Sequence, residues 1–356
     1  MTPTPTLFSV TAFACVTCLM VATLASQAPS TTPSTPDLQM QAVLDEHAKL
    51  GPKPIETLSP NEARKQPSPA DAVTALLKSQ GKSTAPEPVG NVANRSISGA
   101  GAQIPVRIYT PKGTGPFPLL LYIHGGGWVI ADLDTYDASA RALTNAANVV
   151  VVATHYRQAP EHKFPAAHED VYAAYRWATA NAKSINADPA RVAVAGESAG
   201  GNMAAYVSIR ARDESATMPL HQLLVYPVVS TDTNTPSYQE NANAKPLSKA
   251  GMQWFFSHYL TNSSEGNDPR IALLKVTNLK GLPSATVITA QIDPLRSEGQ
   301  MYADRLRDAG VSVTYRNYDG VTHEFFGMGV VVDKAKEAVQ LAGTELKNAL
   351  QGTTQR

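Results

Sequence analysis

Short apolar runs alternate with helical patterns through most of this chain, and this alternation limits the fold more than any other feature. The central runs, such as VVVVATHY at 149–156, are continuously apolar and rich in β-branched residues. Strands of this kind are buried on both faces, as in a parallel sheet with helices on each side. We therefore predict the α/β class, with a mostly parallel central sheet. The strand-like runs lie at 106–110, 119–124, 149–156, 192–196, 223–229, 285–291 and 312–318.

The first residues have a different pattern. An uncharged apolar run at 7–25 is followed by small residues, which predicts an export signal over residues 1–26 and a periplasmic or secreted protein. The preceding segment, MTPTPT, has no Lys or Arg. An uncleaved membrane anchor is therefore the alternative, since about 19 apolar residues just span a bilayer. Cys15 and Cys18, the only cysteines, lie in this run, so a cleaved chain has no disulfide and no thiol nucleophile.

Three further segments complete the predicted organisation. Residues 27–37, QAPSTTPSTPD, have the composition of a disordered linker. Apolar residues spaced by three and four predict two or three short helices within 38–85, apart from the main sheet. The α/β domain is expected to occupy residues 86–356.

Charge and metal-ligand patterns exclude several classes of function. Lys plus Arg and Asp plus Glu number 30 each, so the formal charge is zero and no basic surplus favours nucleic acid. The sequence has no H-E-x-x-H pattern and no clustered His and Asp set. We therefore expect no metal, no cofactor and no nucleic-acid partner.

The stretch RVAVAGESAGGNMAAYV contains G-x-S-x-G at residues 196–200, between a strand-like run and a helical pattern. Gly196 and Gly200 allow a turn sharp enough to expose Ser198 at its tip. The Ser198 hydroxyl then lies at the N-terminus of the next helix, which favours developing negative charge. The pattern also arises by coincidence, so its context carries the interpretation. We predict that Ser198 is a nucleophile.

Three consecutive glycines follow His124 in the run LLLYIHGGGWVI at 119–130. Attack of a serine on an ester carbonyl creates an oxyanion, which needs fixed N–H donors. Backbone approaches a substrate closely only where side chains are absent. We predict that the N–H groups of Gly126, Gly127 and Ala199 form this oxyanion hole. A phosphate-binding loop is a weak alternative, because no G-K-[ST] or G-x-G-x-x-G pattern is present.

A serine hydroxyl needs a base, and the base needs an orienting acid. In hydrolases with this serine turn, the chain order is Ser, acid, His. His323 follows the last strand-like run, and Asp293 ends the run before it, so both fit this order with Ser198. Asp319 and Glu298 are weaker candidates for the acid, in an expected turn and helix. The other histidines considered and set aside are His47, His162, His168 and His221.

Together these motifs resemble the hormone-sensitive-lipase-like (bacterial family IV) esterases of the α/β-hydrolase superfamily. The resemblance covers roughly residues 90–345 and implies an α/β-hydrolase fold with a sheet of about eight strands. It also implies the triad and the oxyanion hole named above, and a helical cap from 38–85 with part of 232–265. The matching stretches are HGGGW (124–128), YRQAPEHKFPAAHED (156–170), DPARVAVAGESAGG (188–201), YPVVS (226–230), DPLRSEG (293–299) and His323.

This chain departs from the family pattern at a few positions. Ser297 stands where Asp is frequent, Glu324 where Gly is frequent, and Glu197 where Asp is commoner. We expect Ser297 and Glu324 to affect the support or the pKa of His323, and Glu197 to be structural. Trp128 is predicted either to line the substrate pocket or to lie in the core.

The resemblance implies a serine carboxylesterase that hydrolyses short- to medium-chain acyl esters through an acyl-enzyme on Ser198. An alternative is cleavage of another acyl bond by the same residues: an amide, a lactone, an acetylated carbohydrate or a xenobiotic ester. A non-catalytic receptor is less favoured. Plant gibberellin receptors resemble this family but lack the histidine, whereas His323 is present. The expected partner is a small-molecule ester; self-association stays open, as does a membrane contact through an uncleaved N-terminal segment.

Overall fold

The computed structural model describes residues 1–6 and 34–351. The predicted apolar export run and most of the predicted linker lie outside these residues. Met1–Thr32 and Pro33–Arg356 are separate units, and the fold below belongs to the second. Within the described ranges, no helix combines the length and the apolar character that crossing a bilayer requires.

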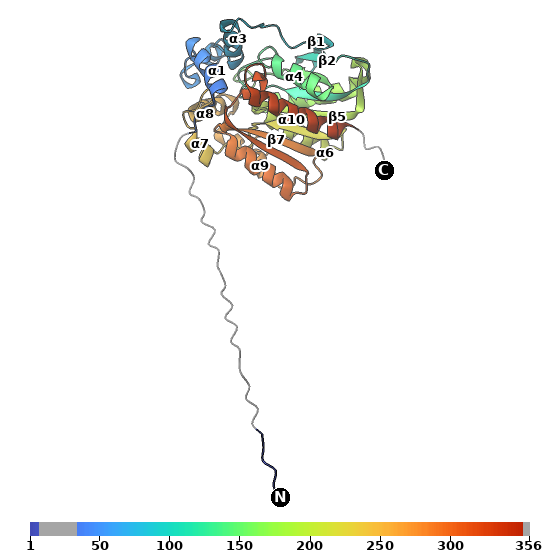
Figure 1. The fold of residues 1–356 in the computed structure, drawn as a ribbon. Coiled ribbons are helices and arrows are strands. Elements are labelled where there is room, and N and C mark those ends of the chain that lie inside the picture. Colours follow the sequence, from blue (N-terminus) through green and yellow to red (C-terminus); the bar gives the residue numbers. More distant parts are fainter. Residues whose placement is uncertain (7–33, 352–356) are drawn as a thin grey trace. The chain divides into compact units, whose positions relative to one another are not determined.

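An eight-stranded sheet forms the centre of the second unit (Figure 1). Its strands are β1 (Asn91–Ser98), β2 (Gln103–Thr110), β3 (Phe117–Ile123), β4 (Val150–Thr154), β5 (Ala187–Glu197), β6 (His221–Val225), β7 (Ser284–Ile292) and β8 (Val313–Thr322). The order across the sheet is β1-β2-β4-β3-β5-β6-β7-β8. β2 pairs antiparallel with β1 and β4, and every neighbouring pair from β4 to β8 is parallel. The predicted mostly parallel α/β sheet is confirmed.

One strand, β1, had no strand-like signal in the sequence. Its residues, NVANRSIS, are mostly polar and most of them are exposed. β1 lies at the edge of the sheet, paired only with β2. An edge strand with one solvated face needs no apolar run, so its pairing partner decides its conformation.

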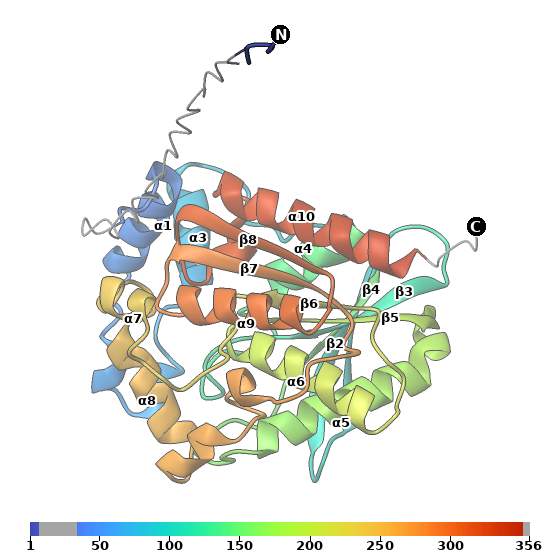
Figure 2. The same ribbon diagram turned by 90° about the horizontal axis from the view of Figure 1, so that it is seen from below.

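Helices cover both faces of the sheet (Figure 2). Along β3, Leu119, Leu121 and Ile123 join one core cluster, while Leu120 and Tyr122 join the other. Helices α5, α6 and α9 pack on the first face, and α4 and α10 on the second. The bounds of these helices are α4 (Asp137–Ala147), α5 (Ala166–Asn181), α6 (Ala199–Asp213), α9 (Arg296–Asp308) and α10 (Asp333–Leu350).

Short helices in two segments, which we call the cap segments (38–85 and 232–265), lie near the end of the sheet where β5, β7 and β8 finish (Figure 1). They add no strand to the sheet, as expected, but the first segment is not detached from it. Met40 and Leu76 share a core cluster with Tyr318 of β8. The helices are α1 (Leu38–Lys49), α2 (Pro60–Ala63), α3 (Pro69–Ser79), α7 (Pro236–Glu240), α8 (Lys249–Tyr259) and the 3₁₀ turns η1 (Ile55–Thr57) and η3 (Ser263–Asn267).

Candidate active site

The turn between β5 and α6 holds Ser198 in a conformation that few residues adopt. Its φ is 57° and its ψ is −120°, directly before the first residue of α6. A Cβ on Gly196 would lie 2.1 Å from the Gly200 carbonyl oxygen, and a Cβ on Gly200 would lie 2.1 Å from the Ile123 carbonyl oxygen. Both flanking positions therefore require glycine, as the sequence pattern indicated.

Three side chains that are far apart in the sequence meet at the carboxyl edge of the sheet. His323 Nε2 lies 3.0 Å from Ser198 Oγ, and His323 Nδ1 lies 2.7 Å from Asp293 Oδ2. The second oxygen of Asp293 accepts a hydrogen bond from the Leu295 N–H at 2.8 Å. Because a carboxylate can only accept, Nδ1 carries the proton and Nε2 is free to accept from the Ser198 hydroxyl.

The surroundings of His323 make its imidazole a stronger base than usual. Burial by itself would lower the pKa of His323, but the Asp293 carboxylate, then Glu324 and Glu197, outweigh this and raise it. The ring of Tyr226 packs against the imidazole with ring centroids 4.4 Å apart. The imidazole is therefore held between an aromatic ring and a carboxylate, with its Nε2 toward Ser198.

A cavity of about 670 Å³ opens above these groups. Ser198 and His323 lie at its base, and residues of α1, η1 and α8 line its walls. This size is typical of a small-molecule site. Residues of both cap segments thus bound the cavity.

The glycine loop after β3 lies against the same cavity. Gly126 and Gly127 both line it and have φ values of 91° and 56°, in the left-handed region that favours glycine. A Cβ on Gly127 would lie 2.2 Å from the ring of Phe255 in α8. The Gly126 carbonyl accepts from the N–H groups of Val129 and Ile130, each at 3.0 Å, which closes the loop. Ala199 is buried at the start of α6, next to Ser198.

Buried polar groups support the turn from behind. Glu197 accepts hydrogen bonds from the hydroxyls of Tyr122, at 2.5 Å, and Tyr226. Burial, and then the nearby Glu324 carboxylate, raise the pKa of Glu197 to about 7. Glu197 is buried and does not line the cavity, so its two tyrosine hydrogen bonds support the backbone that carries Ser198.

His124 supports the glycine loop. Burial lowers its pKa to about 3, so the imidazole is neutral. Its Nδ1 lies 2.8 Å from the Gly125 carbonyl oxygen, and its Nε2 lies 2.9 Å from His155 Nδ1. A neutral imidazole donates from only one nitrogen, and a carbonyl can only accept, so Nδ1 donates to Gly125 and Nε2 accepts from His155.

Trp128 is fully buried, and among the described residues it is not part of the cavity lining. Its ring stacks on Tyr259 of α8, with centroids 4.5 Å apart and planes 4° from parallel. This placement favours the core alternative, and a substrate contact by Trp128 stays a prediction.

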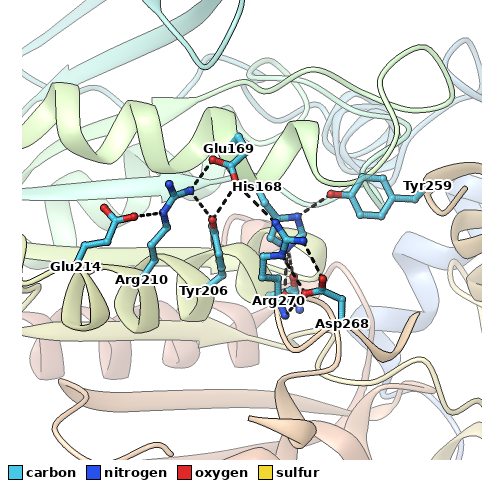
Figure 3. A network of polar contacts seen from close by, with 9 residues as sticks. His168, Glu169, Tyr206, Arg210, Glu214, Tyr259, Asp268 and Arg270 are labelled. Carbon is cyan, nitrogen blue, oxygen red and sulfur yellow. Dashed lines mark hydrogen bonds and ion pairs between the residues drawn. The ribbon is translucent and has the colours of Figure 1, made fainter. Parts of the chain in front are cut away.

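The histidine set aside in α5, His168, joins the cap to the helix that follows Ser198 (Figure 3). Its Nδ1 lies 2.7 Å from the Tyr259 hydroxyl, and its Nε2 lies 2.9 Å from Asn202 Oδ1. Asn202 Nδ2 donates to the carbonyls of Val228 and Ile271, so its oxygen accepts and Nε2 of His168 must carry the proton. His168 is a structural link between α5, α6 and α8.

The alternatives for the acid lie elsewhere. Glu298 is buried and accepts from the N–H groups of Val229 and Ser230. Asp319 is exposed on β8 and accepts from the Asn317 amide at 2.9 Å. Neither side chain forms a hydrogen bond or an ion pair with His323, whereas Asp293 does. Ser297 accepts a hydrogen bond from the Ser237 N–H of α7 at 3.1 Å, and its expected effect on His323 stays a prediction.

Sequence reasoning missed two residues that shape the site. The Tyr136 hydroxyl donates to Glu324 Oε1 at 2.6 Å. Arg64, at the end of α2, donates to the Val129 carbonyl beside the glycine loop at 2.9 Å. Neither residue belongs to a local motif, and each contact spans more than 60 positions, so no local signal could have found them. Within residues 1–6 and 34–351, no group of three or more His, Cys, Asp or Glu side chains is arranged to hold a metal ion.

Comparison with known proteins agrees with this architecture. Residues 120–327 match the alpha/beta hydrolase fold family. The carboxylic ester hydrolase LipN of Mycobacterium tuberculosis is 43% identical over 244 residues, covering 67% of this chain and 65% of LipN. An ethyl acetate hydrolase of Pseudomonas putida is 32% identical over 321 residues, covering 88% of this chain and 99% of that protein. A solved ester hydrolase from the metagenome of Lake Arreo, in complex with a bipyridine phosphonate derivative, has a TM-score of 0.78 at 37% identity, covering 87% of this chain and 98% of that one.

The chain belongs to the α/β-hydrolase family. Within that family it is a carboxylic ester hydrolase, and the resemblance to hormone-sensitive-lipase-like esterases is confirmed.

Proposed function

We propose that this ester hydrolase acts through a triad of Ser198, Asp293 and His323. The observation that carries the proposal is the pair of short contacts at His323, 3.0 Å to the serine hydroxyl and 2.7 Å to the carboxylate. The raised pKa of the buried imidazole supports its role as a base. The cavity above Ser198 supplies room for an ester.

The reaction proceeds in two acyl transfers. Ser198 Oγ forms a bond to the ester carbonyl carbon while His323 Nε2 takes the hydroxyl proton, and the carbonyl π electrons move onto its oxygen. The N–H groups of Gly126, Gly127 and Ala199 stabilise that oxyanion. Its collapse breaks the bond to the alcohol, which takes the proton from Nε2. Water then attacks the acyl-enzyme by the same sequence and releases the acid and Ser198.

The proposed substrates are esters with short to medium acyl chains. The cavity has a volume of about 670 Å³ and is bounded by the cap segments, which limits the length of the acyl chain. One relative, which aligns with this chain over 99% of its own length, is named an ethyl acetate hydrolase. Its name supports a preference for small acyl groups. A series of p-nitrophenyl esters of increasing chain length measures this preference, and a rise in kcat/KM toward long chains contradicts it.

The triad is tested by replacing its nucleophile. Ser198→Ala is expected to lower kcat for p-nitrophenyl acetate by about 10³-fold or more. A phosphonate ester is expected to label the wild type at Ser198 and to leave the variant unlabelled. Retained turnover in the variant, or a folded wild type without turnover, contradicts the proposal, and the second result is what the receptor alternative predicts.

We also propose that the protein is exported. The uncharged apolar run at 7–25, followed by small residues, supports a cleaved signal. Cell fractionation with N-terminal sequencing tests this, with a mature N-terminus near residue 27 expected. Full-length protein in the membrane fraction favours the anchor alternative instead.

A further inference from the structure

A second carboxylate lies beside the reactive nitrogen of the base. Glu324 follows His323 directly, and its Oε1 lies 3.8 Å from His323 Nε2. This is the nitrogen that faces Ser198 and receives its proton under the proposed function. The Glu324 side chain is 20% exposed and lines the substrate cavity. It is therefore inside the site, on the side of the imidazole opposite the Asp293 contact.

The position of Glu324 is fixed by its neighbours. Its φ is 70°, in the left-handed region that an L side chain adopts at a cost of about 1–2 kcal/mol. The Tyr136 hydroxyl donates to Glu324 Oε1 at 2.6 Å and so fixes the carboxylate near the imidazole. Tyr136 lies under the glycine loop, because a Cβ on Gly125 would lie 2.3 Å from its hydroxyl. Position 324 thus has a strained backbone that disfavours glutamate, and the Tyr136 hydrogen bond holds the Glu324 carboxylate in place.

We propose that Glu324 is a positioning residue that acts through His323: its negative charge stabilises the imidazolium that forms when Ser198 gives up its proton. The proposal rests on the triad assignment above and deepens it. Two unit charges about 4 Å apart interact measurably even in a wet environment, and more strongly in a buried one. Asp293 acts on Nδ1, and Glu324 acts on Nε2, so the two carboxylates stabilise opposite edges of one ring.

Other charged and titratable groups around His323 were weighed against this role. Both oxygens of Glu197 accept hydrogen bonds from tyrosine hydroxyls, so Glu197 acts on His323 only through its charge. Burial, with a smaller contribution from Asp293, raises the pKa of Glu324 above its usual value, although the nearby His323 and the Tyr136 hydrogen bond partly offset this. The His323 cation favours the ionised carboxylate, so the charge of Glu324 is most strongly favoured when the imidazolium forms. Among the described residues, the groups that face His323 or share its cavity are Asp293, Glu197, Tyr226, Tyr136, Ser198, Asp45, His47, Lys53, Glu56, Arg64, Asp71 and Lys245.

The acid limb of the pH–rate profile tests the proposal. Removal of the negative charge lowers the pKa of His323, so the neutral base persists to lower pH. In Glu324→Gln, the midpoint of the acid limb of kcat/KM is expected to move down by about one pH unit. The plateau is expected to fall by about tenfold, since the imidazolium loses a stabilising charge in the transition state. The amide oxygen still accepts from Tyr136, so only the charge changes.

Two further variants separate charge from structure. Glu324→Gly removes the charge together with the backbone strain, and it is expected to shift the acid limb in the same direction. Glu337→Gln changes an exposed carboxylate of α10 that does not line the cavity, and it is expected to leave the limb in place because solvent screens that charge. An unshifted limb in both Glu324 variants, with lower activity, overturns the proposal and leaves Glu324 a structural role.

A measurement without turnover keeps the proposal independent of the assigned activity. The imidazole of His323 is titrated by NMR in Ser198→Ala and in Ser198→Ala/Glu324→Gln. A lower titration midpoint in the double variant supports the proposal, and equal midpoints overturn it. If Ser198→Ala retains esterase activity, the triad assignment fails, and the NMR comparison still decides the role of Glu324.

Discussion

At the scale of single residues, the position of Ser198 depends on a close contact between the backbones of α6 and β3. Helix α6 approaches β3 so closely that a Cβ on Gly200 would lie 2.1 Å from the Ile123 carbonyl oxygen. Such a contact cannot be relieved by a side-chain rotation, because both partners belong to the main chain. The same approach places Ser198 at the tip of the turn. Close packing therefore requires glycine at position 200. At Gly81 the only reason for glycine is a positive φ of 65°, because a Cβ there would have no atom within 4 Å.

These two glycines give a matched prediction. Gly200→Ala is expected to lower the free energy of unfolding by more than about 3 kcal/mol, because α6 must move away from β3. Gly81→Ala is expected to cost only about 1 kcal/mol, the strain of the left-handed region. Urea denaturation followed by circular dichroism measures both. Similar losses in the two variants would show that the contact at Gly200 relaxes freely.

At the scale of elements, the first cap segment holds the loop that carries the proposed oxyanion hole. Arg64, at the end of α2, donates to the carbonyl oxygens of Val129 and Ala159, at 2.9 and 2.7 Å. It also forms a two-point ion pair with Glu161. Val129 N–H in turn donates to Gly126 in the glycine loop. A side chain from the N-terminal helices thus fixes backbone about 65 positions further along.

We expect Arg64→Met to lower kcat/KM for p-nitrophenyl acetate by about tenfold, with a smaller effect on stability. The reason is that small displacements of catalytic donors are costly to the transition state. Steady-state kinetics and a thermal melt of the same sample measure the two effects. The control is Lys65→Met, which removes the exposed neighbouring charge and is expected to resemble the wild type. Equal kcat/KM values for the two variants would contradict a role of Arg64 in holding the glycine loop.

At the scale of the whole molecule, the polar network of Figure 3 joins the cap to the hydrolase core. His168 contacts Tyr259 of the cap and Asn202 of α6 through its two ring nitrogens. Burial lowers the pKa of His168 to about 4, from a usual value of 6.5. The unfolded chain therefore binds a proton at this residue at higher pH than the folded chain does. The stability that His168 contributes is present above about pH 6.5 and is lost as the pH falls toward 4.

The prediction is a stability gap that depends on pH. Wild type is expected to be more stable than His168→Gln at pH 7, and the gap is expected to narrow by about 2 kcal/mol at pH 5. Urea denaturation at both pH values measures it. His162→Gln, which removes an exposed imidazole, serves as the control. A gap that stays constant or widens on acidification contradicts the assignment of a neutral, buried His168.

The sequence alone determined the fold class, the ester-hydrolase class and most of the sheet. The turn Gly196–Gly200 and the glycine loop are local patterns, because each strand–turn–helix unit needs its own residue types. The order of Ser198, Asp293 and His323 along the chain can also be read without coordinates. The predicted α/β fold and the ester-hydrolase class are confirmed. The edge strand β1 was missed, since a half-solvated strand carries no apolar run.

Only the tertiary structure decided which distant groups meet at the site. It places Glu324 3.8 Å from His323 Nε2, Tyr136 on Glu324, and Arg64 behind the glycine loop. It also places Ser297 in a hydrogen bond with the Ser237 N–H, and it favours the core over the pocket wall for Trp128, which stacks on Tyr259. The physical reason is that a motif fixes the chain over a few residues, whereas these contacts arise where separate elements pack, and packing depends on the whole chain.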